Sequence, residues 1–174
     1  MQEVENCSPP WLKLLLEANF FVDYQTHGHY KYMQCNHYCI ECTGNPFCSY
    51  CLDDHKNHQI IQMRRSSLSN DVRVDDIRKH INVGAIQPYM INKRQITFLN
   101  SRPYIGLPCG VTNICNICRR SLPAANFEFC SLSCKHEAIY RGFPKQTFAL
   151  ETKLSTCEVD DSFQIYQSST PKGN

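Results

Sequence analysis

The sequence has no long hydrophobic run, no strong excess of one charge and little glycine. Nothing in it approaches the roughly 20 apolar residues that span a membrane, because the run WLKLLLEANFF is interrupted by Lys13 and Glu17. The 7 glycines form no phosphate-binding loop, and the chain has no nucleophile, general-base or cofactor motif. We therefore expect no membrane span, no enzyme activity and no small-molecule substrate.

Cysteine, in contrast, is abundant, with 12 residues in a chain of 174. The opening residues MQEVENCSPP are acidic where a signal peptide is basic, so we expect the chain to stay in a reducing compartment. In such a compartment, paired C-x-x-C and H-x-x-H motifs indicate metal sites rather than disulfides. The length fits one domain or two small ones.

The charges are unevenly distributed along the chain, although the net charge is only +2. Residues 1–58 carry 3 Lys or Arg against 7 Asp or Glu, whereas residues 59–102 carry 8 against 3. The remaining residues carry 7 against 6. A polyanion such as DNA would therefore favour the middle of the chain.

The hydrophobic pattern divides the chain into short elements. After Pro9 and Pro10, the residues Trp11, Leu14, Leu15 and Ala18 recur at helical spacing, which predicts a short amphipathic helix that covers a zinc module or binds a partner. The runs IIQMRR, VRV, PYMI and ITFLN favour strands, and VDDIRKHI between them favours a helical turn.

We expect four regions from these patterns. They are a zinc module over residues 9–58, a basic β-rich unit over residues 59–102, a four-cysteine zinc finger over residues 103–141 and a polar, disordered tail over residues 142–174. Together they predict a small zinc-rich α+β fold.

The stretch CIECTGNPFCSYCLDDHKNH contains six side chains of the kind that bind zinc. They are Cys39, Cys42, Cys48, Cys51, His55 and His58. A structural zinc takes four ligands, so the six would serve two ions if further ligands lay elsewhere, and His27 is an upstream candidate. The alternative is a set of buried thiols.

A second group of cysteines has the spacing C-x2-C-x11-C-x3-C. Its members are Cys115, Cys118, Cys130 and Cys134. The segment FEFCSLSCK predicts a strand that delivers Cys130 and a helical turn that carries Cys134, as in a treble-clef zinc finger. Cys7, Cys109 and Cys157 fit neither group and are expected to be ordinary free thiols.

The spacing H-x11-C-x2-C-x5-C-x2-C-x3-H-x2-H resembles the first signature of the PLATZ family, plant zinc-dependent proteins that bind A/T-rich DNA. Further blocks over residues 9–136 resemble the family in the same order: PPWLKLLLEANFF, CNHYCIEC, CLDDHKNHQIIQMRRSSLSNDVRVDDI, QPYMINKRQITFLNSRP, NICNICRRSL and FCSLSCK. The resemblance implies a nuclear protein that represses transcription, with structural zinc.

The first signature is also similar to the B-box zinc module, in which alternate ligand pairs share an ion. That likeness implies one cross-braced site made of Cys39, Cys42, His55 and His58, and another that contains His27, Cys48 and Cys51.

The second of these sites lacks its expected fourth ligand. The family signature opens with C-x2-H, and Tyr24 stands where that cysteine is expected. Tyrosine, with a pKa near 10, is a poor substitute for a thiolate. The replacements that remain open are Cys35, His29, His37, Asp23 or a water. We therefore expect two zinc ions, and a third only if a substitute ligand is present.

The candidate DNA contacts lie in the basic middle of the chain. They are Arg64, Arg65, Arg73, Lys93 and Arg94. The segments MRRSS and NKRQ combine cations with small polar side chains, a composition suited to phosphate contacts, and arginine also enters narrow A/T-rich minor grooves. The alternative is that these residues form an ordinary solvated basic face.

A protein-binding role is the alternative function. B-box-like modules commonly mediate protein contacts, and the acidic N-terminal region suits that role better than DNA binding. The chain would then be an adaptor in a transcription or ubiquitin-linked complex, although it has no RING-type ligase signature and no coiled coil.

Overall fold

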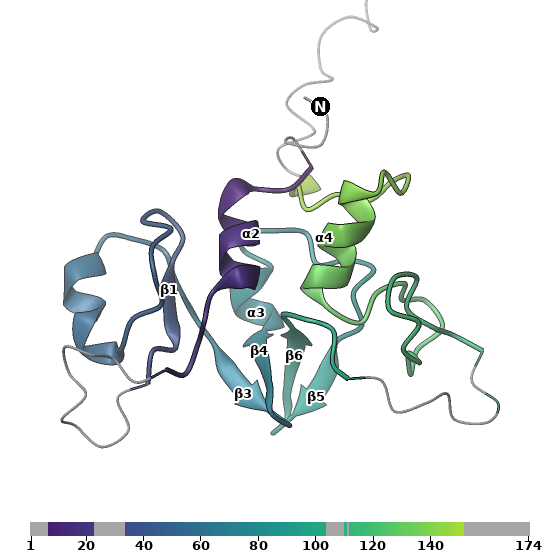
Figure 1. Ribbon diagram of the computed structural model, residues 1–174, viewed down its shortest axis with the longest axis horizontal. Helices are drawn as coiled ribbons and strands as arrows, with labels where there is room; N and C mark the ends of the chain where they lie inside the picture. The colour runs from purple at the N-terminus through teal and green to yellow at the C-terminus, as the bar shows by residue number, and fades with distance from the viewer. Residues whose placement is uncertain (1–6, 23–33, 104–109, 111, 152–174) are drawn as a thin grey trace, which may run out of the picture.

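The computed structural model describes residues 7–22, 34–103, 110 and 112–151, and it shows the expected α+β fold (Figure 1). Its helices are α2 (Pro10–Glu17), the 3-10 helix η1 (Ser49–His55), α3 (Val74–Ile77) and α4 (Leu132–Tyr140). Its strands are β1 (His37–Cys39), β2 (Ile60–Gln62), β3 (Arg64–Ser66), β4 (Ser69–Arg73), β5 (Tyr89–Ile91) and β6 (Arg94–Phe98).

The strands form two antiparallel sheets. β1 pairs with β2, and the larger sheet has the order β3-β4-β6-β5. Two-residue turns join β3 to β4 and β5 to β6, and all four turn residues have positive φ: Ser67 (50°), Leu68 (63°), Asn92 (49°) and Lys93 (62°). Positive φ at both central positions defines the type I′ turn, whose twist matches that of paired strands.

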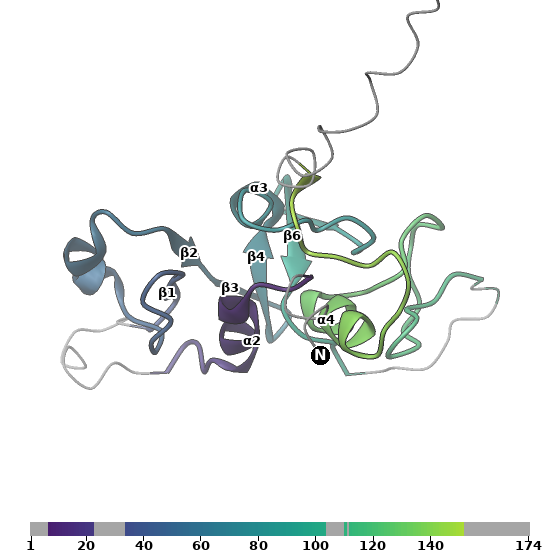
Figure 2. The same ribbon diagram turned by 90° about the horizontal axis from the view of Figure 1, so that it is seen from above.

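The pairing of β1 with β2 crosses the boundary that we expected after residue 58. Cys39 lies opposite Ile60, and Tyr38 lies opposite Ile61. Ile60–Gln62 are therefore joined to the segment that carries the first cysteines. In Figures 1 and 2 this segment lies on one side of the central body, and the segment with the second cysteine group lies on the other.

Helix α2 buries a face that differs from the predicted one. Leu12 and Leu15 are fully buried, whereas the side chain of Leu14 is 45% exposed. The helix packs against α4, which lies far away in the sequence, so the apolar contact is set by this partner. The predicted helix itself is confirmed, and Pro10 occupies its first turn, where a missing N–H costs nothing.

A single hydrophobic core connects the helices, the larger sheet and both cysteine-rich segments. It extends from Leu12 through Tyr38 and Val72 to Phe129. The buried ammonium of Lys135, in α4, donates hydrogen bonds to the carbonyl oxygens of Asn82 (2.8 Å) and Gly84 (2.9 Å). Burial lowers the pKa of Lys135 to about 8. These two bonds fasten α4 to the loop before β5.

The first ten residues of the expected tail are packed against the body. Phe148 is 1% exposed, its N–H donates to the carbonyl of Cys7 (2.7 Å), and its carbonyl accepts from the N–H of Asn82 (2.8 Å). Residues 142–151 thus belong to the folded part of the chain. Polar composition concealed this, because the segment is held by contacts with residues elsewhere in the chain, including a hydrogen bond from Gln146 Nε2 to the Glu128 carboxylate (2.9 Å).

The difference between Leu14 and Leu15 gives a direct test of the α2 packing. Leu15→Ala should lower the free energy of unfolding by about 2–5 kcal/mol, because it removes buried methyl groups and leaves a cavity. Leu14→Ala, the matched control one residue away, should change it by less than about 0.5 kcal/mol. Denaturant unfolding measures both, and similar losses would refute the buried face described here.

Candidate metal centres and basic sheet

The structure brings Cys39, Cys42, His55 and His58 together, with one ligand atom of each within 4.8 Å of the others. Cys39 ends β1, and a turn in which the Thr43 N–H donates to the Cys39 carbonyl (3.1 Å) places Cys42 beside it. The Cys42 sulfur lies 3.5 Å from His55 Nδ1 and 3.3 Å from His58 Nδ1. The Cys39 sulfur lies 3.4 Å from His58 Nδ1.

Neighbouring side chains hold this first cluster in shape. The ring of Phe47 stacks on that of His55, with centroids 4.4 Å apart and 17° between the planes. The Glu41 carboxylate accepts from the Gln59 N–H at 2.9 Å, next to the Cys39 sulfur at 3.7 Å. Cys39 is buried, but Cys42 and His58 are exposed, so the cluster is open to solvent on one side.

Cys48 and Cys51 lie beside each other but outside this cluster, with their sulfur atoms 4.0 Å apart. Cys48 and Cys35 are buried. His37 is also buried, its ring lies 5.9 Å from that of Phe47, and burial lowers its pKa. The other residues considered for this site, Asp23, Tyr24, His27 and His29, lie outside the described residues.

The second cluster contains Cys115, Cys118, Cys130 and Cys134, again with the ligand atoms within 4.8 Å of one another. The first pair lies on a tight turn, closed by hydrogen bonds from Cys115 N–H to the Arg120 carbonyl (2.7 Å) and from Arg119 N–H to the Cys115 carbonyl (3.0 Å). Arg119 takes a φ of 66° in this turn. Cys118 and Cys130 have sulfur atoms 3.4 Å apart.

The second pair lies where the chain passes from the sheet into α4. Parallel bridges on either side of Cys130 join Phe129 to Ile86 and Ser131 to Phe98. Ser131 caps α4 by accepting from the N–H of Cys134 (3.3 Å), which places that cysteine in the first turn of the helix. A helical turn carrying Cys134 was predicted; the strand expected at Cys130 is reduced to these two isolated bridges.

The thiols of the second cluster affect one another strongly because three of the four are buried. Hydrogen bonds from Cys130 and Cys134 lower the pKa of Cys115 well below its usual range. The same contact with Cys115 raises the pKa of Cys130 and, to about 12, that of Cys134. A divalent cation would remove this competition by letting the thiols ionise together, and four sulfur donors in this arrangement fit zinc.

Strand register determines which cations share a face of the larger sheet. Paired residues share a face of the sheet, and so do residues two apart on one strand. Arg64 in β3 pairs with Asp71 in β4, and Arg73 lies two residues after Asp71. Arg73 in turn pairs with Ile96 in β6, and Arg94 lies two residues before Ile96. Because side chains alternate along a strand, Arg64, Arg73 and Arg94 point to one face and Arg65 to the other.

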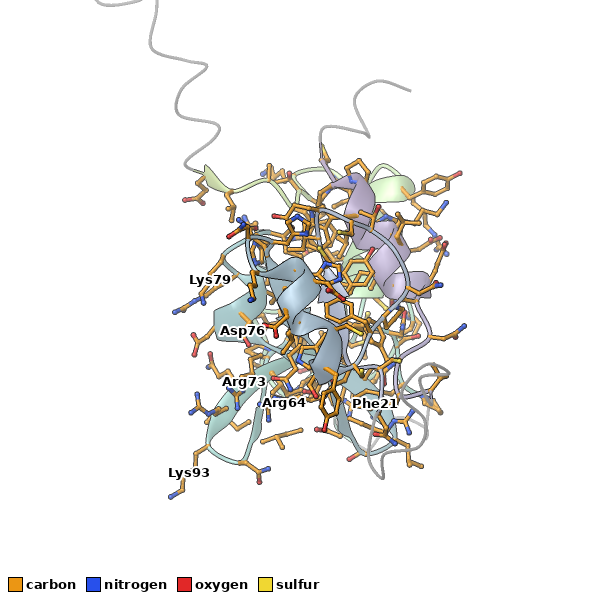
Figure 3. The ribbon with its side chains drawn as sticks, turned by 90° about the vertical axis from the view of Figure 1, so that its left-hand side faces the viewer. Phe21, Arg64, Arg73, Asp76, Lys79 and Lys93 are labelled. Carbon is orange, nitrogen blue, oxygen red and sulfur yellow. The ribbon has the colours of Figure 1, made fainter. Side chains whose placement is uncertain are left out.

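The opposite face gives Arg65 a different environment. The guanidinium of Arg65 lies 4.8 Å from the centroid of the Phe21 ring. Figure 3 shows Arg73 and Lys93, together with Lys79, along one edge of the molecule, with Arg64 nearer its centre. The five candidate DNA contacts therefore do not form one continuous patch.

One arginine site was missed by sequence reasoning. The guanidinium of Arg102 stacks over Phe98 (4.0 Å) and Tyr89 (4.8 Å), and Arg120 Nη1 donates to the adjacent Pro103 carbonyl (2.8 Å). These contacts connect the turn of the second cluster to the sheet. The basic residues were visible in the sequence, but their aromatic partners are brought close only by strand pairing.

A family model described as PLATZ transcription factor matches residues 64–136, which include the larger sheet and the whole second cluster. The chain is 32% identical over 135 residues to Protein RGF1 inducible transcription factor 1 of Arabidopsis thaliana. Over the larger sheet and the second cluster, the chain is similar to the PLATZ family. This confirms the resemblance found in the sequence, and both descriptions agree with the expectation that the protein is not an enzyme.

The match to the plant relative covers 78% of this chain but only 52% of the relative, so the chain spans about half the relative's length. No solved structure matches the chain significantly. Within the described residues, no helix is both long and apolar enough to cross a membrane.

The raised thiol pKa values predict a steep pH dependence of zinc binding by the second cluster. At neutral pH, metal-free Cys130 and Cys134 hold their protons, which zinc must displace. The logarithm of the zinc affinity should therefore rise with pH by at least about two per unit.

Competition with a chromogenic chelator between pH 6 and 8 measures this slope. The Cys42→Ser variant restricts the measurement to the second cluster, and Cys7→Ser, outside both clusters, serves as the control. A slope of one or less would show that the buried thiols do not carry these protons.

Proposed function

We propose that the chain is a zinc-dependent DNA-binding protein of the nucleus that represses transcription from A/T-rich sites. The observation that carries this proposal is the sheet face shared by Arg64, Arg73 and Arg94. Arg64 and Arg94 are exposed, and the carboxyl of Asp71, which lies opposite Arg64, is fully buried. Phosphate contacts need such outward cations on a rigid support.

Zinc supplies the rigid support. The second cluster continues directly from the sheet through the Phe98–Ser131 bridge, and Ser133 N–H donates to the Leu99 carbonyl (2.8 Å). Losing the ion would leave four cysteine side chains at this junction without the shared cation that holds them together. Apparent zinc energies of about 10–16 kcal/mol in finger peptides are comparable to the whole stability of a domain, about 5–15 kcal/mol.

The proposal assigns one ion to each described cluster. Cys39, Cys42, His55 and His58 would hold the first, in the cross-braced manner of a B-box, with Cys48 and Cys51 interleaved between these pairs in the sequence. The second cluster would hold its ion as a treble-clef-like finger, two ligands from a turn and two from the start of α4. A third ion on His27, Cys48 and Cys51 needs a fourth ligand in place of Tyr24.

A protein-binding adaptor is the second candidate function. A groove of about 1060 Å³ lies between α2 and α4, with Lys13, Glu17 and Tyr140 among the residues that line it. The side chain of Tyr140 is 73% exposed. Such a mixed apolar and charged groove suits a peptide, and its occupation would not require the arginines of the sheet.

Single substitutions test the DNA surface. Arg64→Ala and Arg94→Ala should each weaken binding to an A/T-rich duplex and reduce the salt dependence of the logarithm of affinity by about 0.9, the loss of one phosphate contact. Lys56→Ala, an exposed cation whose partner is Asp53, is the matched control and should change neither. Fluorescence anisotropy at several salt concentrations measures both quantities.

These outcomes separate the two candidate functions. If neither arginine substitution affected binding, the DNA-binding surface would not be this face of the sheet. A wild-type protein that binds no duplex even at low salt would favour the adaptor.

Native mass spectrometry of protein purified without added metal tests the zinc assignment. We expect two ions, with one lost in Cys42→Ser and the other in Cys134→Ser. Cys134→Ser should also abolish DNA binding, because its cluster is bonded to the sheet, while Cys42→Ser should weaken it much less. Equal effects on DNA would contradict the supporting role given to the second cluster, and three ions would show that the His27 site is complete.

A further inference from the structure

The turn between β3 and β4 presents an apolar side chain to solvent. Leu68 is 92% exposed, the highest value among the exposed large hydrophobic residues of the described chain. It also has a φ of 63°, and Ser67 before it has a φ of 50°. Two-residue turns of this type are ordinarily made by Asn-Gly or Asp-Gly, because a left-handed backbone crowds the Cβ of other residues.

Leu68 is therefore unfavourable for the fold in two independent ways. Its backbone conformation is strained for a leucine, and its side chain gains nothing from burial. The second turn of the sheet, Asn92-Lys93, has the same geometry with two polar residues. A strained residue whose side chain stabilises nothing within the described structure points to a contact outside the chain.

The surroundings of Leu68 favour nucleic acid as that contact. Small polar side chains flank it: Ser66, Ser67, Ser69 and Asn70. Their hydroxyl and amide groups can donate to the base acceptors that A·T pairs present in the minor groove. The two strands of a hairpin lie about 4.8 Å apart, and small side chains keep its tip narrow enough for a minor groove about 6 Å wide.

The two arginines of β3 suit the two phosphate backbones that border a minor groove. Arg64 and Arg65 lie in β3 on opposite faces of the hairpin, so each can approach a different phosphate backbone. The ring of Phe21 packs against the guanidinium of Arg65, which remains exposed to solvent. The acidic residue of the hairpin, Asp71, is fully buried, so its carboxylate would make no direct contact with the DNA.

We propose that Leu68 is an apolar wedge that enters the minor groove of A/T-rich DNA and partly unstacks one base step, with the β3–β4 hairpin as its support. Minor-groove proteins commonly insert leucine, methionine or phenylalanine in this way and bend the duplex. The wedge accounts for a preference for TA steps within A/T-rich DNA, because these pyrimidine–purine steps unstack easily, without base-specific arginine contacts. This inference rests on the proposed DNA binding.

Leu68→Asn tests the wedge without endangering the fold, since asparagine tolerates positive φ and suits this turn. The thermal midpoint should stay the same or rise. The affinity for an A/T-rich duplex should fall about tenfold at every salt concentration, equivalent to about 1.4 kcal/mol. The salt dependence should stay unchanged, because no phosphate contact is lost.

A duplex carrying 2-aminopurine at successive positions reports the unstacking directly, and end-labelled energy transfer reports the bend. Wild-type protein should raise the fluorescence at one step and shorten the end-to-end distance, whereas Leu68→Asn should do neither. Leu68→Met, which keeps an apolar tip, should behave like wild type. Met90→Thr, which removes another exposed apolar side chain (66%) from the same sheet, is the matched control and should also behave like wild type.

The outcomes separate the inference from the function on which it rests. If wild-type protein and Leu68→Asn bind and bend the duplex equally, the wedge is refuted and DNA binding stands. A reduced salt dependence in Leu68→Asn would also overturn the wedge, because the leucine would then act through the arginines. If wild-type protein binds no duplex, the proposed function fails and the wedge falls with it.

Discussion

The junction between the larger sheet and the second cysteine cluster is the constraint on which the rest of the structure depends. Phe129 and Ser131 pair with two segments of the sheet region, and Cys130 between them is fixed in position before α4 begins. These bridges join the position of the cluster to that of the sheet end. A metal ion here would stabilise both at once.

The same junction explains why α4 and α2 occupy their positions. Ser131 starts α4, Lys135 then fastens the helix to the loop before β5, and α2 packs on the surface that results. The buried ammonium of Lys135 is costly to desolvate, but two carbonyl groups and the ring of Phe148 at 5.0 Å compensate for part of that cost. Residues far apart in the chain thus depend on one local arrangement of four cysteines.

The metal-ligating side chains could be predicted from the sequence, whereas the pairing of distant segments could not. Ligand spacing identified the side chains of both clusters, because a C-x-x-C turn and a helical H-x-x-H turn are set by nearest neighbours. The runs PYMI and ITFLN identified β5 and β6 in the same way. The run VRV reaches only the end of β4, and the run IIQMRR is divided between β2 and β3, which belong to different sheets. The adjacent Arg64 and Arg65 looked like one basic pair, but strand alternation sends them to opposite faces.

Longer-range contacts explain the remaining differences. The buried face of α2 depends on α4, and the packing of Phe148 depends on Cys7 and Asn82, near the start and the middle of the chain. Neither contact can be predicted from local hydrophobic periodicity, which reports only the pattern within one segment.

The two clusters differ in burial, and this difference separates their roles. The second has three buried sulfurs and is bonded to the sheet, so its ion would leave only with disruption of the core. The first has exposed Cys42 and His58, lies on the other side of the body and is joined to the sheet through β2 and Met63. Solvent and competing ligands reach an exposed ion more easily than a buried one. The fold thus combines one cluster that is bonded to the larger sheet with one whose ion could be exchanged while the sheet remains intact.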